Sequence, residues 1–168
     1  MKNLLLYARI CPLPSQFSIK IFNELKDLEN ITPRVLDSNQ PFDAIKEQEY
    51  LKEFDNIILL FPINWFNLPW NLSRYMAEVW RTGDFNLSGK KIHVIITTGS
   101  QENIYSKEGF GWKIDEYFNN LFSVAKRLKT EISTFEYFYG CATKNPDDQE
   151  FLDFISKIKN LYINKINK

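Results

Sequence analysis

The chain has 168 residues, of which 44% are hydrophobic, 15% aromatic and 25% charged. Its 21 basic and 21 acidic residues cancel, which excludes the strongly basic surface of a typical nucleic-acid binder and the high net charge of a disordered chain. This length suits a single domain, residues 1–168, built around its own hydrophobic core.

The cysteines and the apolar runs indicate the compartment. The two cysteines, Cys11 and Cys141, show neither a metal-binding nor a disulfide-rich spacing, which favours reduced thiols and predicts no metal site. The apolar run near the N-terminus is too short for a signal peptide, and no stretch approaches the length of a membrane span. The sequence therefore predicts a cytoplasmic protein without a membrane span.

Apolar and amphipathic runs alternate from the first residues onward. Residues 3–8 (NLLLYA) are continuously apolar and predict a buried strand, and an amphipathic pattern from Ser15 to about residue 28 predicts a helix. Further along the chain the pattern predicts a strand at 32–36, a short helix at 43–53 and a strongly buried strand at 56–61 (NIILLF).

The alternation continues to the end of the chain. It predicts a helix from residue 69 to about 80, a buried strand at 91–97 (KIHVIIT), a helix at 114–128, a strand at 131–138 and a final helix with apolar residues between 151 and 162. Continuously apolar strands that alternate with helices indicate an α/β fold, in which helices cover both faces of a parallel sheet. Five strands suit a three-layer, flavodoxin-like sandwich with the strand order 2-1-3-4-5.

Three predicted loops meet at one edge of such a sheet. They are residues 9–18 (RICPLPSQFS), 62–69 (PINWFNLP) and 97–111 (TTGSQENIYSKEGFG). In this strand order the ligand crevice lies at the carboxyl ends of strands one, three and four, where these loops begin. The third loop is long for a compact domain, and long loops of this kind usually carry function.

The composition of these loops favours a flat, anionic ligand. Ser15 and Ser18 lie at a predicted helix start, where unpaired N–H groups and the helix dipole attract an anion. Trp65 and Phe66 follow a buried strand directly, where two aromatic rings could lie against a planar ligand. The third loop begins with small residues, Thr-Thr-Gly-Ser, which let a ring approach the backbone closely.

Together the three loops resemble the flavodoxin-like NAD(P)H:quinone oxidoreductase family, which includes the modulator-of-drug-activity enzymes and the ancillary oxidoreductases of glutathione-gated potassium efflux systems. The resemblance runs from residue 4 to about 161. PINWFNLP is similar to the family's Pro-x-x-Trp-Phe/Tyr-x-x-Pro, and Thr97, Thr98, Gly99, Tyr105 and Gly109 match its Thr-Thr-Gly-x…Tyr-x-x-x-Gly. Residues 47 and 48 match a family Glu-Gln pair.

The resemblance implies a flavin enzyme that passes hydride from NADPH or NADH to its flavin and then two electrons to a quinone-like acceptor. The implied cofactor is FMN, with FAD as the alternative, and Tyr105 is the implied catalytic hydroxyl. The implied cofactor-binding residues are Arg9, Ser15, Phe17, Ser18, Gln48, Pro62, Asn64, Trp65, Phe66, Thr97, Thr98, Gly99, Ser100 and Tyr105.

The chain also departs from the family pattern. The family residues His, Asn, Lys, Asp and His are replaced by Arg9, Ser18, Ser73, Ala77 and Gly111. The only histidine, His93, lies in a predicted strand. These departures favour an alternative function, a flavin-binding regulatory or ancillary protein of an ion-transport system with little turnover. A flavodoxin-type electron carrier fits less well, because the first loop lacks the T-x-T-G-x-T pattern and the chain is not acidic.

Aromatic residues along one predicted helix point to self-association. Trp70, Tyr75 and Trp80 recur on the helix after Pro69, which is more aromatic surface than one buried face needs. Aromatic residues are enriched at the centres of protein interfaces, and two-fold symmetry is the commonest assembly. We therefore expect a homodimer in which the neighbouring subunit completes the active site.

Overall fold

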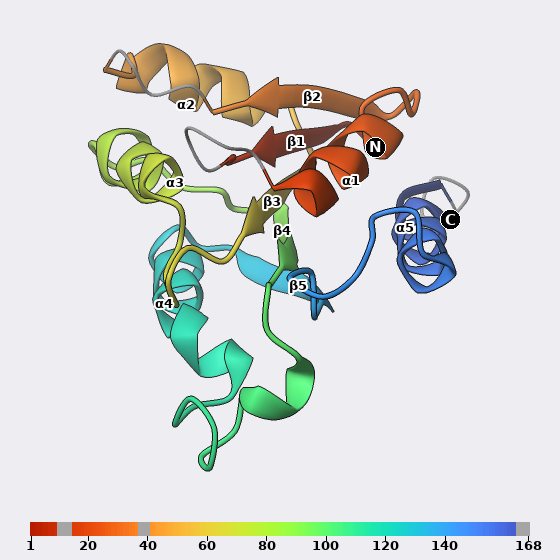
Figure 1. The fold of residues 1–168 in the computed structure, drawn as a ribbon. Coiled ribbons are helices and arrows are strands. Elements are labelled where there is room, and N and C mark those ends of the chain that lie inside the picture. Colours follow the sequence, from red (N-terminus) through yellow and green to blue (C-terminus); the bar gives the residue numbers. More distant parts are fainter. Residues whose placement is uncertain (10–14, 37–40, 164–168) are drawn as a thin grey trace.

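Five parallel strands form one sheet in the computed structural model, which describes residues 1–9, 15–36 and 41–163. The strand order is β2-β1-β3-β4-β5, so the predicted order is confirmed (Figure 1). The strands are β1 (Asn3–Tyr7), β2 (Ile31–Val35), β3 (Asn56–Pro62), β4 (Lys91–Thr97) and β5 (Glu131–Phe138). Every residue of β1 and β3 is buried, as expected for central strands of a sheet that is covered on both faces.

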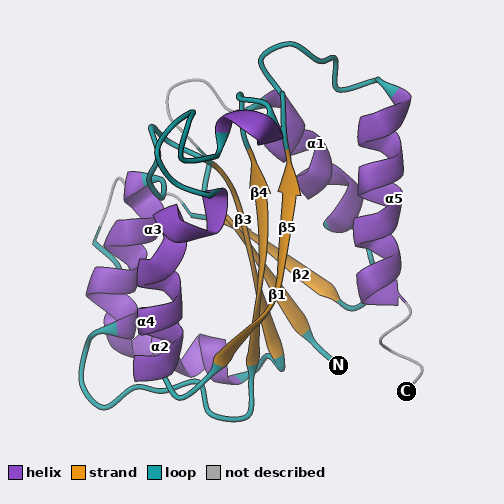
Figure 2. Cartoon of the chain, turned by 90° about the horizontal axis from the view of Figure 1, so that it is seen from below, coloured by secondary structure: helices purple, strands orange, loops and turns teal. Residues whose placement is uncertain are grey.

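The helices cover the two faces of the sheet unequally (Figure 2). One face carries α1 (Gln16–Leu25) and α5 (Gln149–Ile163), and the other carries α2 (Ala44–Lys52), α3 (Trp70–Tyr75) and α4 (Asn119–Arg127). Two 3₁₀ turns, η2 (Glu102–Ile104) and η3 (Ile114–Phe118), lie in the connections around β4 and α4. Within the described residues, no helix combines the length and the apolar character needed to cross a bilayer.

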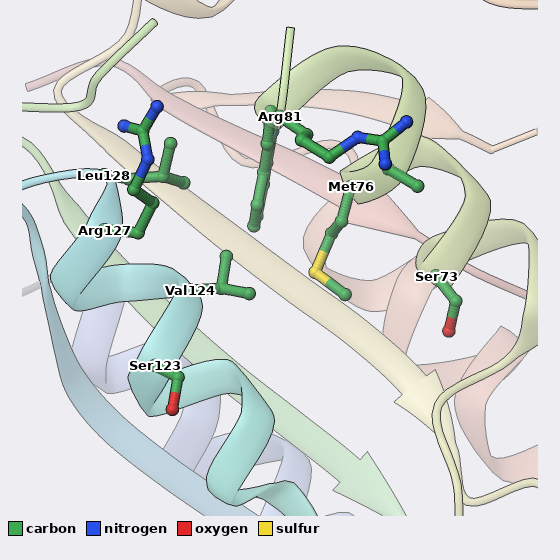
Figure 3. Close-up of a pocket in the computed structure, with 9 residues that line it drawn as sticks. Ser73, Met76, Arg81, Ser123, Val124, Arg127 and Leu128 are labelled. Atoms are coloured by element: carbon green, nitrogen blue, oxygen red, sulfur yellow. The ribbon is translucent and has the colours of Figure 1, made fainter. Parts of the chain in front are cut away.

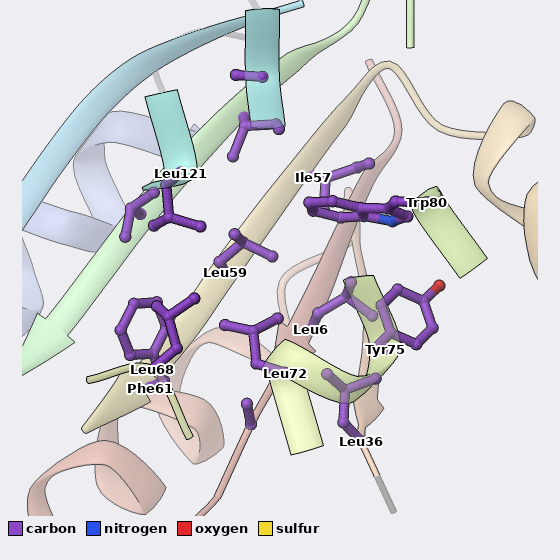
Figure 4. Packing of buried hydrophobic residues seen from close by; sticks show 14 of the residues in the cluster. Leu6, Leu36, Ile57, Leu59, Phe61, Leu68, Leu72, Tyr75, Trp80 and Leu121 are labelled. Atoms are coloured by element: carbon purple, nitrogen blue, oxygen red, sulfur yellow. The ribbon is translucent and has the colours of Figure 1, made fainter. Parts of the chain in front are cut away.

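Each layer has its own hydrophobic core. On the side of α3, the buried side chains include Leu59, Phe61, Leu72 and Trp80, which fill the space between β3 and the helix (Figure 4). On the side of α1, Phe17 is part of a cluster that also includes residues of α5. Because both faces of the sheet are sealed in this way, a ligand can reach the strands at their ends, where the loops lie.

Two predicted helices differ from regular α-helices in the structure. The helix predicted from residue 69 to 80 is α only over Trp70–Tyr75 and then widens into a π-helical turn, η1 (Met76–Trp80). The Arg81 N–H donates to the carbonyl of Met76 at 3.1 Å, a bond that spans five residues. The helix predicted at 114–128 begins with the 3₁₀ turn η3 before α4. Short π-helical turns are often found at functional sites.

Candidate functional site

A cavity of about 360 Å³ opens at the carboxyl ends of the strands. Its walls come from the three predicted loops and from a fourth segment, the loop after β5. The residues that line it are Ser15, Gln16, Phe17, Pro62, Ile63, Thr97, Thr98, Gly99, Cys141 and Ala142. Six of these were predicted from the sequence. Of the first loop, residues 10–14, including Cys11, lie outside the described residues.

The start of α1 forms one side of the cavity. Ser15 caps the helix, because its Oγ accepts a hydrogen bond from the Ser18 N–H at 3.3 Å. The Ser18 hydroxyl is fully buried and lies 2.6 Å from Oγ1 of Thr97. This second bond joins the helix start to the end of β4. The first turn of a helix also has N–H groups without intrahelical acceptors, and here Gln16 and Phe17 bring that turn to the cavity.

The Trp65–Phe66 pair sits in a strained turn. Trp65 has φ 49° and Phe66 has φ 65°, a backbone region that bulky residues rarely adopt. The turn is closed by reciprocal backbone bonds between Asn64 and Asn67, at 2.9 and 3.0 Å, and the Asn67 side chain donates to the Trp65 carbonyl. Trp65 is 86% exposed, so packing does not account for its strain. Such strain is typical of functional sites.

The long loop after β4 presents a hydroxyl pair beside the cavity. The Tyr105 hydroxyl and Oγ1 of Thr98 are hydrogen-bonded, and both residues are buried. The Tyr105 ring packs edge-on against Phe110 and contacts Tyr139. Thr98 lines the cavity and Tyr105 stands behind it. The structure therefore places Tyr105 one side chain away from the cavity wall.

Two glycines allow this loop to fold. A Cβ on Gly109 would lie 2.1 Å from the carbonyl oxygen of Ile104, so only glycine fits there. Gly111 has φ 89°, and its N–H donates to the Ser106 carbonyl at 2.8 Å. Gly111 replaces a histidine of the family pattern, and the backbone explains why: L side chains are strained at this φ.

The fourth wall was missed in the sequence analysis. The N–H groups of Gly140, Cys141 and Ala142 donate to the carbonyls of Ser100, Thr98 and Gly99, at 2.8, 2.9 and 3.2 Å. The sequence held a usable signal, because the loop after the last strand begins at the same edge of a parallel sheet as the other three. Burial raises the pKa of the Cys141 thiol to about 12, so this thiol is protonated at neutral pH.

Arg9 lies at the end of β1 and is exposed. Its carbonyl accepts a hydrogen bond at 3.1 Å from Asn71, whose side chain also donates to Leu36. Asn71 therefore ties α3 to the chain just beyond β1, a positioning role that the sequence analysis did not assign. The Arg9 side chain does not line the cavity.

Gln48 lies away from the crevice. Its side-chain amide donates to the carbonyls of Val79 and Thr82, at 2.7 and 2.8 Å, and so supports the end of the π-helical turn η1. The neighbouring Glu47 pairs with Arg34 and accepts from the Tyr75 hydroxyl. The Glu-Gln pair of the sequence motif thus holds α2 against α3, and the expected contact between Gln48 and the cofactor does not fit this placement.

A substitution of Gln48 distinguishes a structural role from the expected role in binding the cofactor. We expect Gln48→Met to lower the free energy of unfolding by about 1–3 kcal/mol, because it leaves the buried Val79 carbonyl and the partly buried Thr82 carbonyl without this donor. The affinity for flavin should not change. Urea unfolding and a flavin titration measure both quantities. Gln149→Met is the matched control, because the Gln149 amide is exposed on α5 and bonds only to Asp153.

The crevice holds little charge. Within the described residues, no cluster of three His, Cys, Asp or Glu side chains is placed to hold a metal ion. His93 lies in β4, is 3% exposed, and its Nδ1 lies 2.9 Å from Thr134. Desolvation raises the pKa of Tyr139, behind the cavity, to about 12. The site thus consists of aromatic rings, hydroxyls and backbone groups.

Comparison with known proteins gives a family match and several relatives. The model of the family described as "Flavodoxin-like fold" matches residues 1–161. The chain is 34% identical over 95 residues to general stress protein 14 of Bacillus subtilis, covering 51% of this chain and 54% of that protein. It is 31% identical over 96 residues to the uncharacterized NAD(P)H oxidoreductase YrkL of B. subtilis, covering 52% and 55%.

A third relative is an ancillary protein. The chain is 30% identical over 117 residues to the glutathione-regulated potassium-efflux system ancillary protein KefG of Pectobacterium carotovorum, and the match covers 64% of each. The chain therefore spans about half the length of the first two relatives and less than two thirds of the third.

Two solved structures share the fold over nearly the whole chain. The NADPH-quinone reductase of P. pentosaceus superimposes with a TM-score of 0.83 and 22% identity, covering 96% of this chain and 97% of that one. General stress protein 14 of Treponema denticola, solved in complex with FMN, gives a TM-score of 0.78 and 21% identity, covering 94% and 95%. At these identities the likeness extends to the fold alone.

Proposed function

Because the chain belongs to the flavodoxin-like fold family, we propose that it is a flavin-dependent NAD(P)H oxidoreductase that reduces quinone-like acceptors. The observation that carries the proposal is the cavity at the carboxyl ends of the strands, lined by residues of the three loops that the sequence singled out. The names of the relatives YrkL and the P. pentosaceus quinone reductase support the reaction class. The FMN complex of the T. denticola protein supports FMN as the cofactor, with FAD as the alternative.

The residues of the cavity fit a flavin. Its volume lies within the range of small-molecule sites, and its walls carry no ionised side chain. We propose that the first turn of α1, with Ser15 and Phe17, faces the flavin phosphate, because a helix start attracts anions. Arg9, exposed just beyond the end of β1, is the proposed cation for the same group. The Ser18 hydroxyl is already paired with Thr97, so we assign it to holding the helix start in place.

The ring of the flavin would lie between two loops. On one side the strained turn offers Asn64, Trp65 and Phe66, and Pro62 precedes it. On the other side the residues are small: Thr98, Gly99 and Ser100 allow close approach to the backbone. We propose these seven residues as the ring-binding set.

Catalysis by this chain rests on positioning. A bound flavin supplies two-electron hydride chemistry, and the protein orients it and tunes its surroundings. We propose that the turn at Trp65 and the loop at Thr98 orient the flavin, and the Phe110 and Tyr117 rings pack against the Phe66 ring of that turn. The Tyr105 hydroxyl is hydrogen-bonded to Oγ1 of Thr98. We propose that Tyr105 contributes to catalysis by holding the Thr98 hydroxyl in a fixed orientation. Alignment of reactants contributes a large part of the rate in such reactions.

A regulatory or ancillary function is the second candidate. The likeness to KefG favours it, and so do the departures from the family pattern at Arg9, Ser18, Ser73, Ala77 and Gly111. Colour separates the two candidates. Protein purified or reconstituted with FMN should be yellow, and the yellow absorbance should bleach on anaerobic addition of NADPH or NADH and return with a quinone. Yellow protein that does not bleach supports the ancillary function, and protein that binds no flavin contradicts both.

We propose a homodimer, though the aromatic residues differ from those expected. Tyr75 and Trp80 are buried in the core, whereas Trp70 is exposed as expected, and so are three further aromatic residues, Trp65, Phe110 and Trp112. Aromatic residues are enriched at the centres of protein interfaces, so exposed ones of this size favour an interaction site. We expect sedimentation equilibrium to give about twice the chain mass of 19.9 kDa, and the Trp70→Ser/Trp112→Ser variant to dissociate. A wild-type mass equal to one chain would contradict the dimer.

The remaining expectations concern the chain as a whole. We propose that residues 1–168 form one domain, because all five strands belong to one sheet. We also propose a cytoplasmic location, where NAD(P)H and small-molecule acceptors are available and the free thiol of Cys141 stays reduced.

A further inference from the structure

The loop after β5 forms a wall of the crevice that the sequence motifs leave without a role. Cys141 and Ala142 line the cavity beside residues of the other loops. The backbone bonds from residues 140–142 to the carbonyls of residues 98–100 continue the pairing of β4 and β5 beyond the ends of the two strands. This wall is therefore fixed directly to the segment that begins at Thr98.

Side-chain bonds close the same turn. The Gln101 amide donates to the Thr143 hydroxyl at 3.0 Å, and that hydroxyl donates to the Gly140 carbonyl at 3.2 Å. Gln101 follows the Thr98 segment directly, so these bonds join the two loops a second time. The position of Cys141 and Ala142 is thus set by both backbone and side-chain contacts.

The far end of the loop is tied to α1. Lys20 donates to the Pro146 carbonyl at 2.9 Å and pairs with Asp147 at 2.6 Å. At the start of the loop, the Phe17 ring of α1 stacks on the Phe138 ring at the end of β5, with the ring centroids 5.7 Å apart. The connection from β5 to α5 (Figure 1) therefore borders both the Thr98 segment and α1.

We propose that Cys141 and Ala142 bind the ribityl chain of the flavin. The inference rests on the proposed function, in which the first turn of α1 faces the flavin phosphate and the Thr98 segment approaches the ring. The ribityl chain joins these two parts of the flavin, and the wall at residues 141 and 142 borders the two protein segments that face them. Contact with the chain between phosphate and ring is the role left for this wall.

The small side chain of Ala142 keeps this part of the cavity open. Ala142 is exposed and lines the cavity, and a Cβ built on Gly99 would lie 3.6 Å from the Ala142 Cβ. A larger side chain at residue 142 would therefore occupy cavity space beside the Thr98 segment.

Ala142→Leu tests the assignment by filling that space. Ala142 is exposed and its φ is not positive, so the variant should fold. We expect the affinity for FMN and for riboflavin to fall about ten-fold or more, because overpacking a fitted site is costly. Lumiflavin has the ring without the ribityl chain, and its affinity should stay within about two-fold of the wild-type value. Fluorescence titration with each flavin measures these affinities.

Ala77→Leu is the matched control. Ala77 is also exposed, but it lines a separate pocket of about 400 Å³ between the segment α3–η1 and α4 (Figure 3). None of the residues that line this second pocket lines the crevice. The same added side chain there should leave the affinity for all three flavins unchanged.

The Cys141 thiol gives a second readout in the unaltered protein. Mass spectrometry of its peptide can follow the rate of alkylation by N-ethylmaleimide at mildly alkaline pH. The reaction is slow because burial raises the thiol pKa, and its rate reports access to this wall. We expect saturating FMN to slow it about ten-fold or more, since a ligand on the wall covers the sulfur.

The outcomes separate this inference from the proposed function. Wild-type protein that binds none of the three flavins contradicts the proposed function, and the inference with it. Where the wild type binds FMN, the inference alone is overturned if Ala142→Leu keeps its FMN affinity or if bound FMN leaves the alkylation rate of Cys141 unchanged. It is also overturned if lumiflavin loses as much affinity as FMN in Ala142→Leu, which would place the ring and not the ribityl chain on this wall.

Discussion

Replacing Tyr105 with phenylalanine should slow NADPH-dependent quinone reduction by the flavin-loaded protein about ten-fold or more. The substitution removes the hydroxyl that pairs with Oγ1 of Thr98, and Thr98 lines the cavity in which we propose the flavin ring lies. A freed threonine hydroxyl can rotate, and small misplacements of reacting groups reduce rates strongly. Stopped-flow measurement of flavin reduction and reoxidation gives the two half-reactions separately.

Tyr117→Phe is the matched control for this variant. Tyr117 belongs to the same aromatic group and contacts Phe66, but its hydroxyl donates to the Phe110 carbonyl and not toward the cavity. We expect its rates to stay within about two-fold of the wild type, because one exposed hydrogen bond is worth little. Equal slowing in both variants would show that Tyr105 acts only through packing of the loop, and an unchanged rate in Tyr105→Phe would remove its role altogether.

The same reaction should be insensitive to pH between about 6 and 8. The only histidine lies within β4 and bonds to Thr134, away from the crevice. Burial raises the pKa of both Cys141 and Tyr139 to about 12, so each keeps its proton as the pH rises through this range and neither changes charge. A rate that fell or rose with a midpoint near the usual histidine pKa of about 6.5 would contradict this picture.

The strand order and the edge that carries the site could be predicted because they depend on local patterns. The apolar runs at β3 and β4 are long enough to identify central strands, and strand polarity then brings the loops at residues 62 and 97 to one edge. The family motifs added Trp65, Phe66, Thr98 and Tyr105. These features needed no knowledge of which side chains meet in space.

The remaining features depend on contacts between distant parts of the chain. Ser18 appears as a free hydroxyl at a helix start, but it is bonded to Thr97, 79 residues later. Gln48 appears beside a crevice motif, but it supports carbonyls at Val79 and Thr82. On a regular α-helix Trp80 is expected to be an exposed aromatic residue available for an interface. The π-helical turn changes which side chains face the sheet, and Trp80 is buried in the structure. Periodicity carries no information about any of these partners.

Replacing Trp65 with asparagine should have opposite effects on stability and on flavin binding. Trp65 adopts φ 49°, which costs an L-residue about 1–2 kcal/mol, whereas asparagine tolerates this region better. Because Trp65 is so exposed, its removal loses little packing, and we expect the free energy of unfolding of the flavin-free protein to rise by about 1 kcal/mol. The affinity for FMN should fall about ten-fold as an aromatic contact is lost.

Trp112→Asn tests whether strain is the cause. Trp112 is also an exposed tryptophan, directly after the third loop, but it is not among the described non-glycine residues with positive φ, which are Trp65, Phe66 and Lys129. The Trp112 variant should therefore gain no stability. If both variants gained equally, the effect would come from removing exposed aromatic surface and not from the turn. If Trp65→Asn gained stability and kept its FMN affinity, the Trp65 side chain would have no part in flavin binding. The strain at its φ of 49° would then have no functional explanation.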